Sequence, residues 1–225
     1  MSRAAAAPLP AGLVPPGDFH PAAGKLGMWV FLFSDAMMFA AIVVTYAMLR
    51  SLDPAWPDPK TRLDINLTGV FTFVLICSSV TMVMGLLAAQ EGNLAGARKY
   101  VALTILGGAG FLGFQTFEWT HFLGHGSGPR TDLFYATFFT LTGFHGFHVL
   151  SGLGVLGWMI WKSRGVPFVP VRVPEPSGRP PGTHTGTGTD TPAVEEYARL
   201  LECGALYWHF VDLVWIVLFT AIYLL

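Results

Sequence analysis

Charged residues are scarce in this chain of 225 residues, since Asp, Glu, Lys and Arg together make up 12% of it. The formal net charge is −1, and no basic stripe is present that would neutralise the phosphates of a nucleic acid. Hydrophobic residues account for 52% and aromatic residues for 14%, which is far from the composition of a soluble domain. The composition therefore argues against a nucleic-acid partner and favours a protein embedded in a lipid bilayer.

Cysteine is nearly absent, with Cys77 in the middle of one apolar run and Cys203 near the start of another. Their expected depths in a bilayer differ too much for disulfide geometry, so we expect two buried, inert thiols. The chain also lacks Cys-x-x-Cys, His-Glu-x-x-His and a glycine-rich phosphate loop. Ser151-Gly152 hints at an intramembrane serine protease, but Val149 stands where that motif needs glycine. These absences exclude the common soluble catalytic patterns.

Long apolar runs are what the chain does have, at about 27–49, 66–89, 100–123, 133–161 and 201–225. Each reaches the ~20 residues that a spanning helix needs, and none alternates as a strand does. The sequence predicts an all-α membrane protein, a five-transmembrane-helix bundle over residues 27–225. Close approach of other helices is expected at four glycines of the third run, namely Gly107, Gly108, Gly110 and Gly113.

Two segments outside these runs are rich in proline. Residues 1–26 are expected to form an amino-terminal arm that is not a cleaved leader, because they lack the apolar centre of a signal peptide. Residues from about 165 to 195 carry Pro, Gly and Thr at a density that cannot bury a core, which predicts a low-complexity surface loop. We expect this loop to tolerate deletion of its centre.

Lysine and arginine are distributed unevenly between the two ends of the predicted helices. Nine flank one side, and four flank the other, namely Arg50, Lys60, Arg62 and Arg130. Cytoplasmic loops of membrane proteins carry the excess of Lys and Arg. The distribution therefore predicts a cytoplasmic amino terminus and a carboxyl terminus outside.

Ionisable residues inside the apolar runs are the candidate functional residues, because a polar side chain is costly in lipid. Asp35 stands alone in the first run, either as an acid satisfied by neighbouring hydroxyls or amides or as a proton or lipid-headgroup site. Glu118 lies near the end of the third run with Gln115 and His121 at three-residue spacing, which favours a buried polar network. The fourth and fifth runs carry the others, which are His145, His148, Glu202, His209 and Asp212.

These residues are expected to meet at one depth. At ~1.5 Å rise per residue, Asp35 and His209 lie ~12 Å from the cytoplasmic end of their helices, and His148 lies ~20 Å from it. With His145 and Asp212 they are predicted to form one broad layer from the midplane to the inner leaflet. A layer of carboxylates and imidazoles can be electrically neutral, and spacing does not decide between a proton relay and a contact between helices.

Two other functions fit the same residues. Histidines on facing helices at one depth would suit a haem b site, so a small haem b membrane cytochrome is an alternative, with His145 or His148 opposite His209. A proton-coupled transporter is a third, although no two halves of the chain look like repeats.

Four segments, in order along residues 24–225, resemble subunit III of the haem–copper terminal oxidases, the cytochrome c oxidase subunit III family, in its short five-helix bacterial form. They are Trp29-Val-Phe-Leu-Phe-Ser-Asp-Ala-Met-Met-Phe39, Gln115-x-x-Glu-Trp119, Thr142-Gly-Phe-His-Gly-Phe-His148 and Tyr207-Trp-His-Phe-Val-Asp-Leu-Val-Trp215. Four ordered motifs are far more specific than any one of them.

The resemblance implies a non-catalytic accessory subunit of a proton-pumping oxidase in aerobic respiration, in the bacterial plasma (inner) membrane. Its partners would be the catalytic subunit I, subunit II and membrane phospholipids, and a larger respiratory supercomplex is compatible with it. Haem and copper would lie in the partner subunits, so this chain would have no catalytic, cofactor-binding or metal residue. The chain would stabilise subunit I, bind phospholipid and support sustained proton uptake and turnover while oxygen is reduced to water. The ionisable residues would then be buried contacts related to lipid or protons, namely Asp35, Glu118, His145, His148, Glu202, His209 and Asp212.

Two departures from the family pattern matter. Asp35 stands where the family often has Glu, and the shorter acid resembles the quinol-oxidising branch, so subunit III of a quinol oxidase is the alternative to that of cytochrome c oxidase. The chain also has five helices, and lacks the two amino-terminal helices that wall a lipid-filled cleft in the longer form.

Overall fold

The computed structural model describes residues 21–164 and 192–225, and within them all regular structure is helical. The elements are α1 Pro21–Leu52, α2 Pro59–Arg62, α3 Ile65–Gln90, α4 Leu94–Gly124, α5 Leu133–Ser163, α6 Pro192–Phe219 and the π-helical turn η1 Thr220–Leu224. Five helices in these ranges are long and apolar enough to cross a membrane. The prediction of an all-α membrane protein with five transmembrane helices is confirmed.

Each helix starts at or before the apolar run that predicted it. The extensions at α3 and α4 follow from side-chain caps, because Asp64 accepts from the backbone N–H of Leu67 and Asn93 accepts from that of Gly96. α6 begins well before residue 201, since Val194 and Tyr197 continue its buried stripe. Residues 21–26 are likewise helical instead of part of an arm. The rest of the predicted arm and most of the predicted loop lie outside the described residues.

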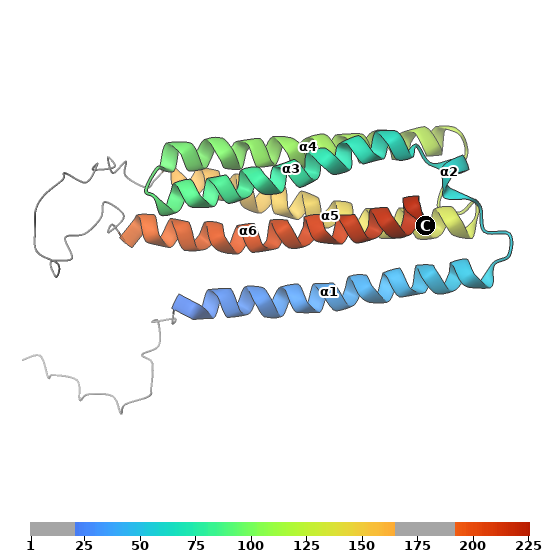
Figure 1. Ribbon diagram of the computed structural model, residues 1–225, viewed down its shortest axis with the longest axis horizontal. Coiled ribbons are helices and arrows are strands. Elements are labelled where there is room, and N and C mark those ends of the chain that lie inside the picture. The colour runs from blue at the N-terminus through green and yellow to red at the C-terminus, as the bar shows by residue number, and fades with distance from the viewer. Residues whose placement is uncertain (1–20, 165–191) are drawn as a thin grey trace, which may run out of the picture.

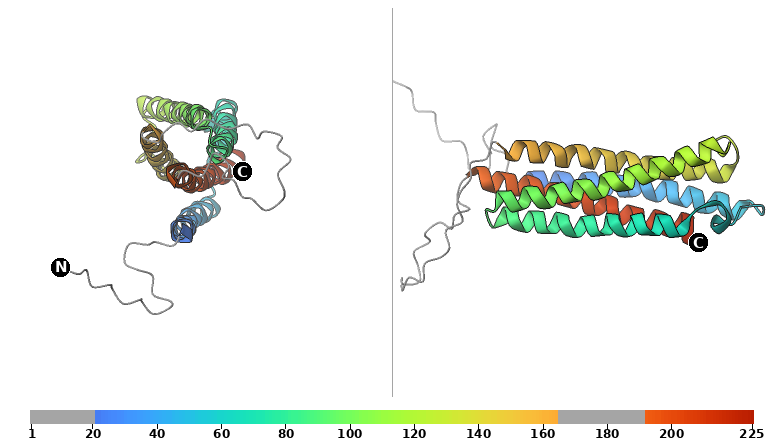
Figure 2. Two further views of the ribbon diagram at one scale, coloured as in Figure 1. Left: turned by 90° about the vertical axis from the view of Figure 1, so that its left-hand side faces the viewer. Right: turned by 90° about the horizontal axis from the view of Figure 1, so that it is seen from above.

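Helices α3, α4, α5 and α6 surround a common core, and α1 lies outside them along α6 (Figures 1 and 2). One end of the molecule holds α2, the α4–α5 turn and the carboxyl terminus, and we call it the α2 end. The other holds the α3–α4 turn and the starts of α1 and α6, and we call it the α3–α4 end. Large aromatic side chains fill the core, among them Trp208, Trp215, Phe111 and Phe138. The five predicted helices thus form a four-helix bundle with a fifth helix beside it.

A single seam connects α1 to this bundle. Leu32, Phe39 and Tyr46 are buried and recur every seven residues, the spacing of a helix that touches its neighbour along one line. Most of the other side chains of α1 are exposed, including Trp29 and Phe33. Asp35 lies on the seam, between Leu32 and Phe39.

The two cysteines are both free, as expected, but they are not both buried. Cys77 is exposed on α3 and Cys203 is half-buried on α6. Lipid is as apolar as the protein core, so an apolar run does not predict which of its side chains face inward.

Two of the four glycines in α4 are close-approach positions. A Cβ atom on Gly107 would lie 2.9 Å from the Cβ of Ser78, and one on Gly108 would overlap the Trp208 ring. Gly110 and Gly113 have no neighbour within 4 Å of such an atom, so no other described helix of this chain approaches them closely. They lie on the side of α4 that faces away from the bundle.

Gly108→Ala should lower the free energy of unfolding by about 1–3 kcal/mol, because the added methyl group forces the Trp208 ring out of its position. Gly110→Ala is the matched control and should be neutral or slightly stabilising, since it adds a good helix former in open space. Unfolding in mixed micelles with increasing SDS, followed by far-ultraviolet circular dichroism, measures both. Equal midpoints for the two variants would contradict the close contact.

Candidate functional site

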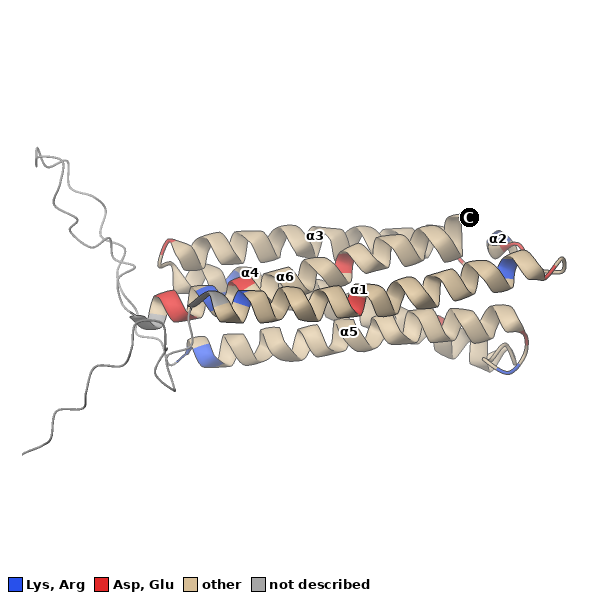
Figure 3. Ribbon diagram, turned by 90° about the horizontal axis from the view of Figure 1, so that it is seen from below, with Lys and Arg blue, Asp and Glu red and all other residues tan. Residues whose placement is uncertain are grey.

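The polar residues inside the membrane-spanning helices are the candidate site. Charged positions are concentrated at the two ends of the helices, and few interrupt their middle parts (Figure 3). Five of the seven candidate residues, namely Asp35, His148, Asp212, Glu118 and Glu202, take part in four separate contacts, each of which connects two helical segments.

Asp35 of α1 faces His148 of α5. The Oδ2 atom of Asp35 lies 3.4 Å from Nε2 of His148, and both side chains are largely buried. This distance suits an ion pair but is long for a hydrogen bond. The edge of the Phe39 ring packs on the imidazole, with 5.0 Å between ring centroids. The polar contact between α1 and α5 is therefore shielded by an aromatic ring.

The hydrogen bonding of His148 fixes which of its nitrogens faces Asp35. Nδ1 of His148 lies 2.7 Å from the carbonyl oxygen of Phe144, so Nδ1 carries a proton and donates it. Nε2 is then the ring nitrogen that faces the carboxyl group of Asp35. The pair thus joins a carboxyl group of α1 to an imidazole of α5.

Asp212 of α6 connects that helix to α3. Its Oδ2 accepts a hydrogen bond of 2.7 Å from the hydroxyl of Ser79, and its Oδ1 has no partner among the described residues. The two tryptophans on either side of Asp212 also bond hydroxyls of α3. The indole N–H of Trp208 donates to Ser78, and that of Trp215 donates to Thr72. The hydroxyls of α3 therefore receive or donate three hydrogen bonds across one interface.

Glu118 of α4 connects that helix to η1. Its Oε2 accepts a hydrogen bond of 3.0 Å from the hydroxyl of Tyr223, and its Oε1 has no partner among the described residues. One turn earlier, the side-chain amide of Gln115 donates to the carbonyl oxygen of Thr142 on α5 at 2.6 Å. Gln115 and Glu118 are both buried and bond different elements, without a hydrogen bond between them among the described residues, while His121 of the same triplet is exposed.

Glu202 lies at the α3–α4 end and forms an ion pair with Lys25 of α1, with 2.6 Å between Nζ and Oε1. Both side chains are partly exposed, so this contact is worth little by itself. Besides Asp35, α1 therefore makes polar contacts through Lys25 and through Arg50, whose guanidinium donates to the carbonyl oxygen of Leu225.

Among the described residues, His145 and His209 form no hydrogen bond or ion pair through their rings. His145 is fully buried between the rings of Phe111 and Trp215, whose centroids lie 5.6 Å and 4.8 Å from that of the imidazole. His209 is half-buried and lines a hollow between α1 and α6, with Leu32 and Ala36. His145 thus points into the four-helix core, whereas His148 on the same helix points to α1.

Within the predicted layer of carboxylates and imidazoles, the described residues show one direct contact of the two kinds, that of Asp35 with His148. Asp212 bonds a serine instead, and His145 and His148 point to different places, because residues three apart on one helix differ by about 60° in direction. The partners Thr72 and Tyr223 were not predicted. Hydroxyl groups are too common in apolar helices to be recognised in a sequence without knowing which helices meet.

Comparison with known proteins gives the family. Residues 21–169 match the family model described as "Cytochrome c oxidase subunit III". Cytochrome c oxidase subunit 3 of Thermostichus vulcanus is 35% identical over 206 residues, which cover 92% of this chain and 89% of that protein. Cytochrome bo(3) ubiquinol oxidase subunit 3 of Pseudomonas putida is 31% identical over 202 residues, covering 89% of this chain and 84% of that protein. The chain therefore belongs to the cytochrome c oxidase subunit III family of the haem–copper oxidases.

Proposed function

We propose that this chain is the non-catalytic subunit III of a proton-pumping haem–copper oxidase in a bacterial plasma membrane, where it stabilises the catalytic subunit I. The observation that carries this proposal is that four of the buried ionisable groups, namely Asp35, His148, Asp212 and Glu118, each contact a side chain of another helical segment. They do not converge on a reaction centre, and in the described residues no group of three His, Cys, Asp or Glu is placed to hold a metal ion. Haem and copper belong to the partner subunits in this proposal.

The surroundings of His145 weigh against the haem b alternative. Two aromatic rings stand against its imidazole on α4 and α6, so a porphyrin would have to displace Phe111 and Trp215 from the core. His209 faces the hollow beside α1, away from that core. A pair of axial ligands from these two histidines would require a different packing of the helices.

The α1 helix is the proposed surface for phospholipid and for subunit I. Two adjoining apolar hollows of about 390 and 330 Å³ run along the contact of α1 with α6 and share Ala36, Phe210 and Leu213. Ala36 and Ala40 give the small-residue spacing that lets an acyl chain or another helix come close. The exposed apolar side of α1 then faces the partner subunit.

The proposed orientation places the α3–α4 end in the cytoplasm and the carboxyl terminus outside. The α3–α4 end holds six of the described Lys and Arg residues and the α2 end holds four. In this orientation Glu202 and Lys25 lie near the inner surface, and Asp35 is reached from the side that supplies protons to an oxidase.

The experiment that tests the proposal is purification of the tagged chain from native membranes in mild detergent. We expect it to bring down a stoichiometric oxidase core that contains haem and copper, because an exposed apolar helix such as α1 needs a partner or lipid to cover it. The copper ligands of the co-purified subunit II, present or absent, then identify the donor as cytochrome c or quinol.

The chain expressed alone is the control for cofactor content. It should show no Soret absorbance, whereas a stoichiometric haem b spectrum that is lost on changing His145 or His209 would favour the small cytochrome. A chain that remains monomeric in native membranes, with neither partner nor haem, would contradict both functions.

A further inference from the structure

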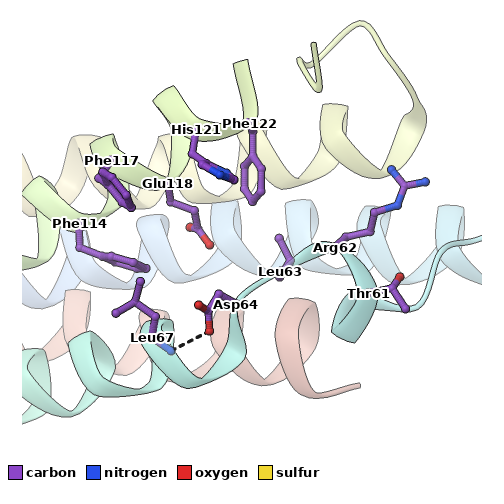
Figure 4. Close-up of a pocket in the computed structure, with 10 residues that line it drawn as sticks. All are labelled: Thr61, Arg62, Leu63, Asp64, Leu67, Phe114, Phe117, Glu118, His121 and Phe122. Carbon is purple, nitrogen blue, oxygen red and sulfur yellow. Dashed lines mark hydrogen bonds between the residues drawn. The ribbon is translucent and has the colours of Figure 1, made fainter. Parts of the chain in front are cut away.

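A cavity of about 340 Å³ lies at the α2 end, between the start of α3 and the end of α4, on the side away from α1 (Figure 4). This volume is about ten times the ~30 Å³ that one water molecule occupies in the liquid. Carboxylates of Glu118 and Asp64 and the rings of Phe114, Phe117 and Phe122 contribute to its walls. The cavity therefore combines acidic and aromatic groups, which is unlike the apolar hollows beside α1.

Glu118 is the buried acid of this cavity, with 8% of the residue exposed. Its carboxylate extends from α4 toward Asp64 on α3 (Figure 4). Tyr223 satisfies one oxygen, and Oε1 has no donor in the described part of the chain. A buried carboxylate oxygen without a donor is costly, so this atom requires a donor that enters from the cavity.

The charges around the cavity select a cation. Asp64 adds a second carboxylate, of which Oδ1 already accepts from the backbone N–H of Leu67. The guanidinium of Arg62 turns away from Glu118 (Figure 4), lies 3.5 Å from Asp132 and stands over the Tyr135 ring. The cavity wall thus presents two carboxylates and the imidazole of His121, and the guanidinium stays at the rim (Figure 4). Aromatic faces beside carboxylates favour an ammonium group over a hydrated metal ion.

An apolar strip leads out of the cavity toward the middle of the bilayer. Leu67 and Phe117, which line the cavity, are 38% and 60% exposed. Val70 and Phe73 continue the exposed apolar side of α3. A ligand that binds in the cavity and also along this apolar strip has an ammonium head and a hydrocarbon tail.

We propose that this cavity binds the headgroup of a zwitterionic phospholipid with a primary ammonium, such as phosphatidylethanolamine. The ammonium donates a hydrogen bond to Oε1 of Glu118, the phosphate lies toward Arg62 at the rim, and an acyl chain follows Leu67 and Phe117. This inference specifies the phospholipid-binding part of the proposed function at a site separate from the hollows beside α1.

Native mass spectrometry of the purified, delipidated full chain tests this site. The probes are phosphatidylethanolamine, phosphatidylcholine and phosphatidylglycerol with identical acyl chains. We expect one phosphatidylethanolamine to be retained, because the trimethylammonium of phosphatidylcholine has no N–H and the anionic phosphatidylglycerol is repelled. Glu118→Gln should weaken retention about tenfold, since it replaces a charge-assisted hydrogen bond with a neutral one.

A second variant keeps the test decisive if Glu118→Gln folds poorly. Phe117→Ala should weaken retention as well, whereas Phe147→Ala on α5, which is 67% exposed and away from the cavity, should not. Equal retention of the three lipids, or unchanged retention in both Glu118→Gln and Phe117→Ala, would overturn the proposal. Assembly with the oxidase core is measured separately, so loss of this site with intact assembly leaves the proposed function standing.

Discussion

Replacing Trp208 with alanine should lower the free energy of unfolding by roughly 3 kcal/mol. The residue is 1% exposed in the centre of the bundle, and its ring lies against Gly108 of α4 and Gly152 of α5. Its indole N–H also donates to Ser78 at 3.1 Å. The expected loss of unfolding free energy is at the low end of the range for replacing a large aromatic residue. In a bilayer the packing contacts of the ring are lost, but the ring is not transferred between water and the protein core. SDS-induced unfolding followed by circular dichroism measures it.

Two further variants separate the causes. Trp208→Phe removes the hydrogen bond and keeps most of the ring, so about 1 kcal/mol is expected. Trp161→Ala on α5, where the side chain is 68% exposed, should change stability by less than about 0.5 kcal/mol. If Trp208→Ala were no more destabilising than Trp161→Ala, the four-helix core described above would be wrong.

Asp35→Asn should leave assembly and initial turnover of the oxidase near normal and shorten the active lifetime several-fold. The asparagine amide can donate to the free lone pair of Nε2 of His148, so the contact between α1 and α5 survives. What disappears is the carboxyl group that faces His148. Oxygen consumption followed to exhaustion, in complexes of equal subunit content, shows the difference as a faster decay.

His148 supplies the matched test of this contact. His148→Gln should give the same faster decay, and the double variant should decay no faster than either single one, because both changes act on the same carboxyl–imidazole pair. Ser34→Ala is the control, since that hydroxyl is exposed and only bonds the carbonyl of Phe31. Decay curves of Asp35→Asn and wild type that superimpose would mean that the pair is a structural contact alone.

The sequence predicts the five helices well and their arrangement poorly, for one physical reason. A long apolar run predicts that a helix spans the bilayer. Because lipid and protein interior are equally apolar, the run does not predict which side of that helix packs against another helix. For this reason the position of α1 outside the bundle, and the exposure of Cys77, could not be predicted. Asp35 and Glu118 could be singled out because ionisable groups are costly in lipid, yet their partners His148 and Tyr223 follow only from the packing.

The position of α1 has a consequence for biogenesis. α1 is synthesised before the four helices of the bundle, while α6, against which most of its seam is buried, is the last of these five helices to be made. The α3–α6 bundle can close without α1, because its core contains Trp208, Trp215 and Phe111 from its own helices. During translation α1 must therefore remain in the membrane as a separate spanning helix. Asp35 then faces lipid until the helix that carries His148 has been inserted. Docking of this first helix is then the final step of folding, and the step at which an insertase or an early-assembling neighbour has the most opportunity to intervene.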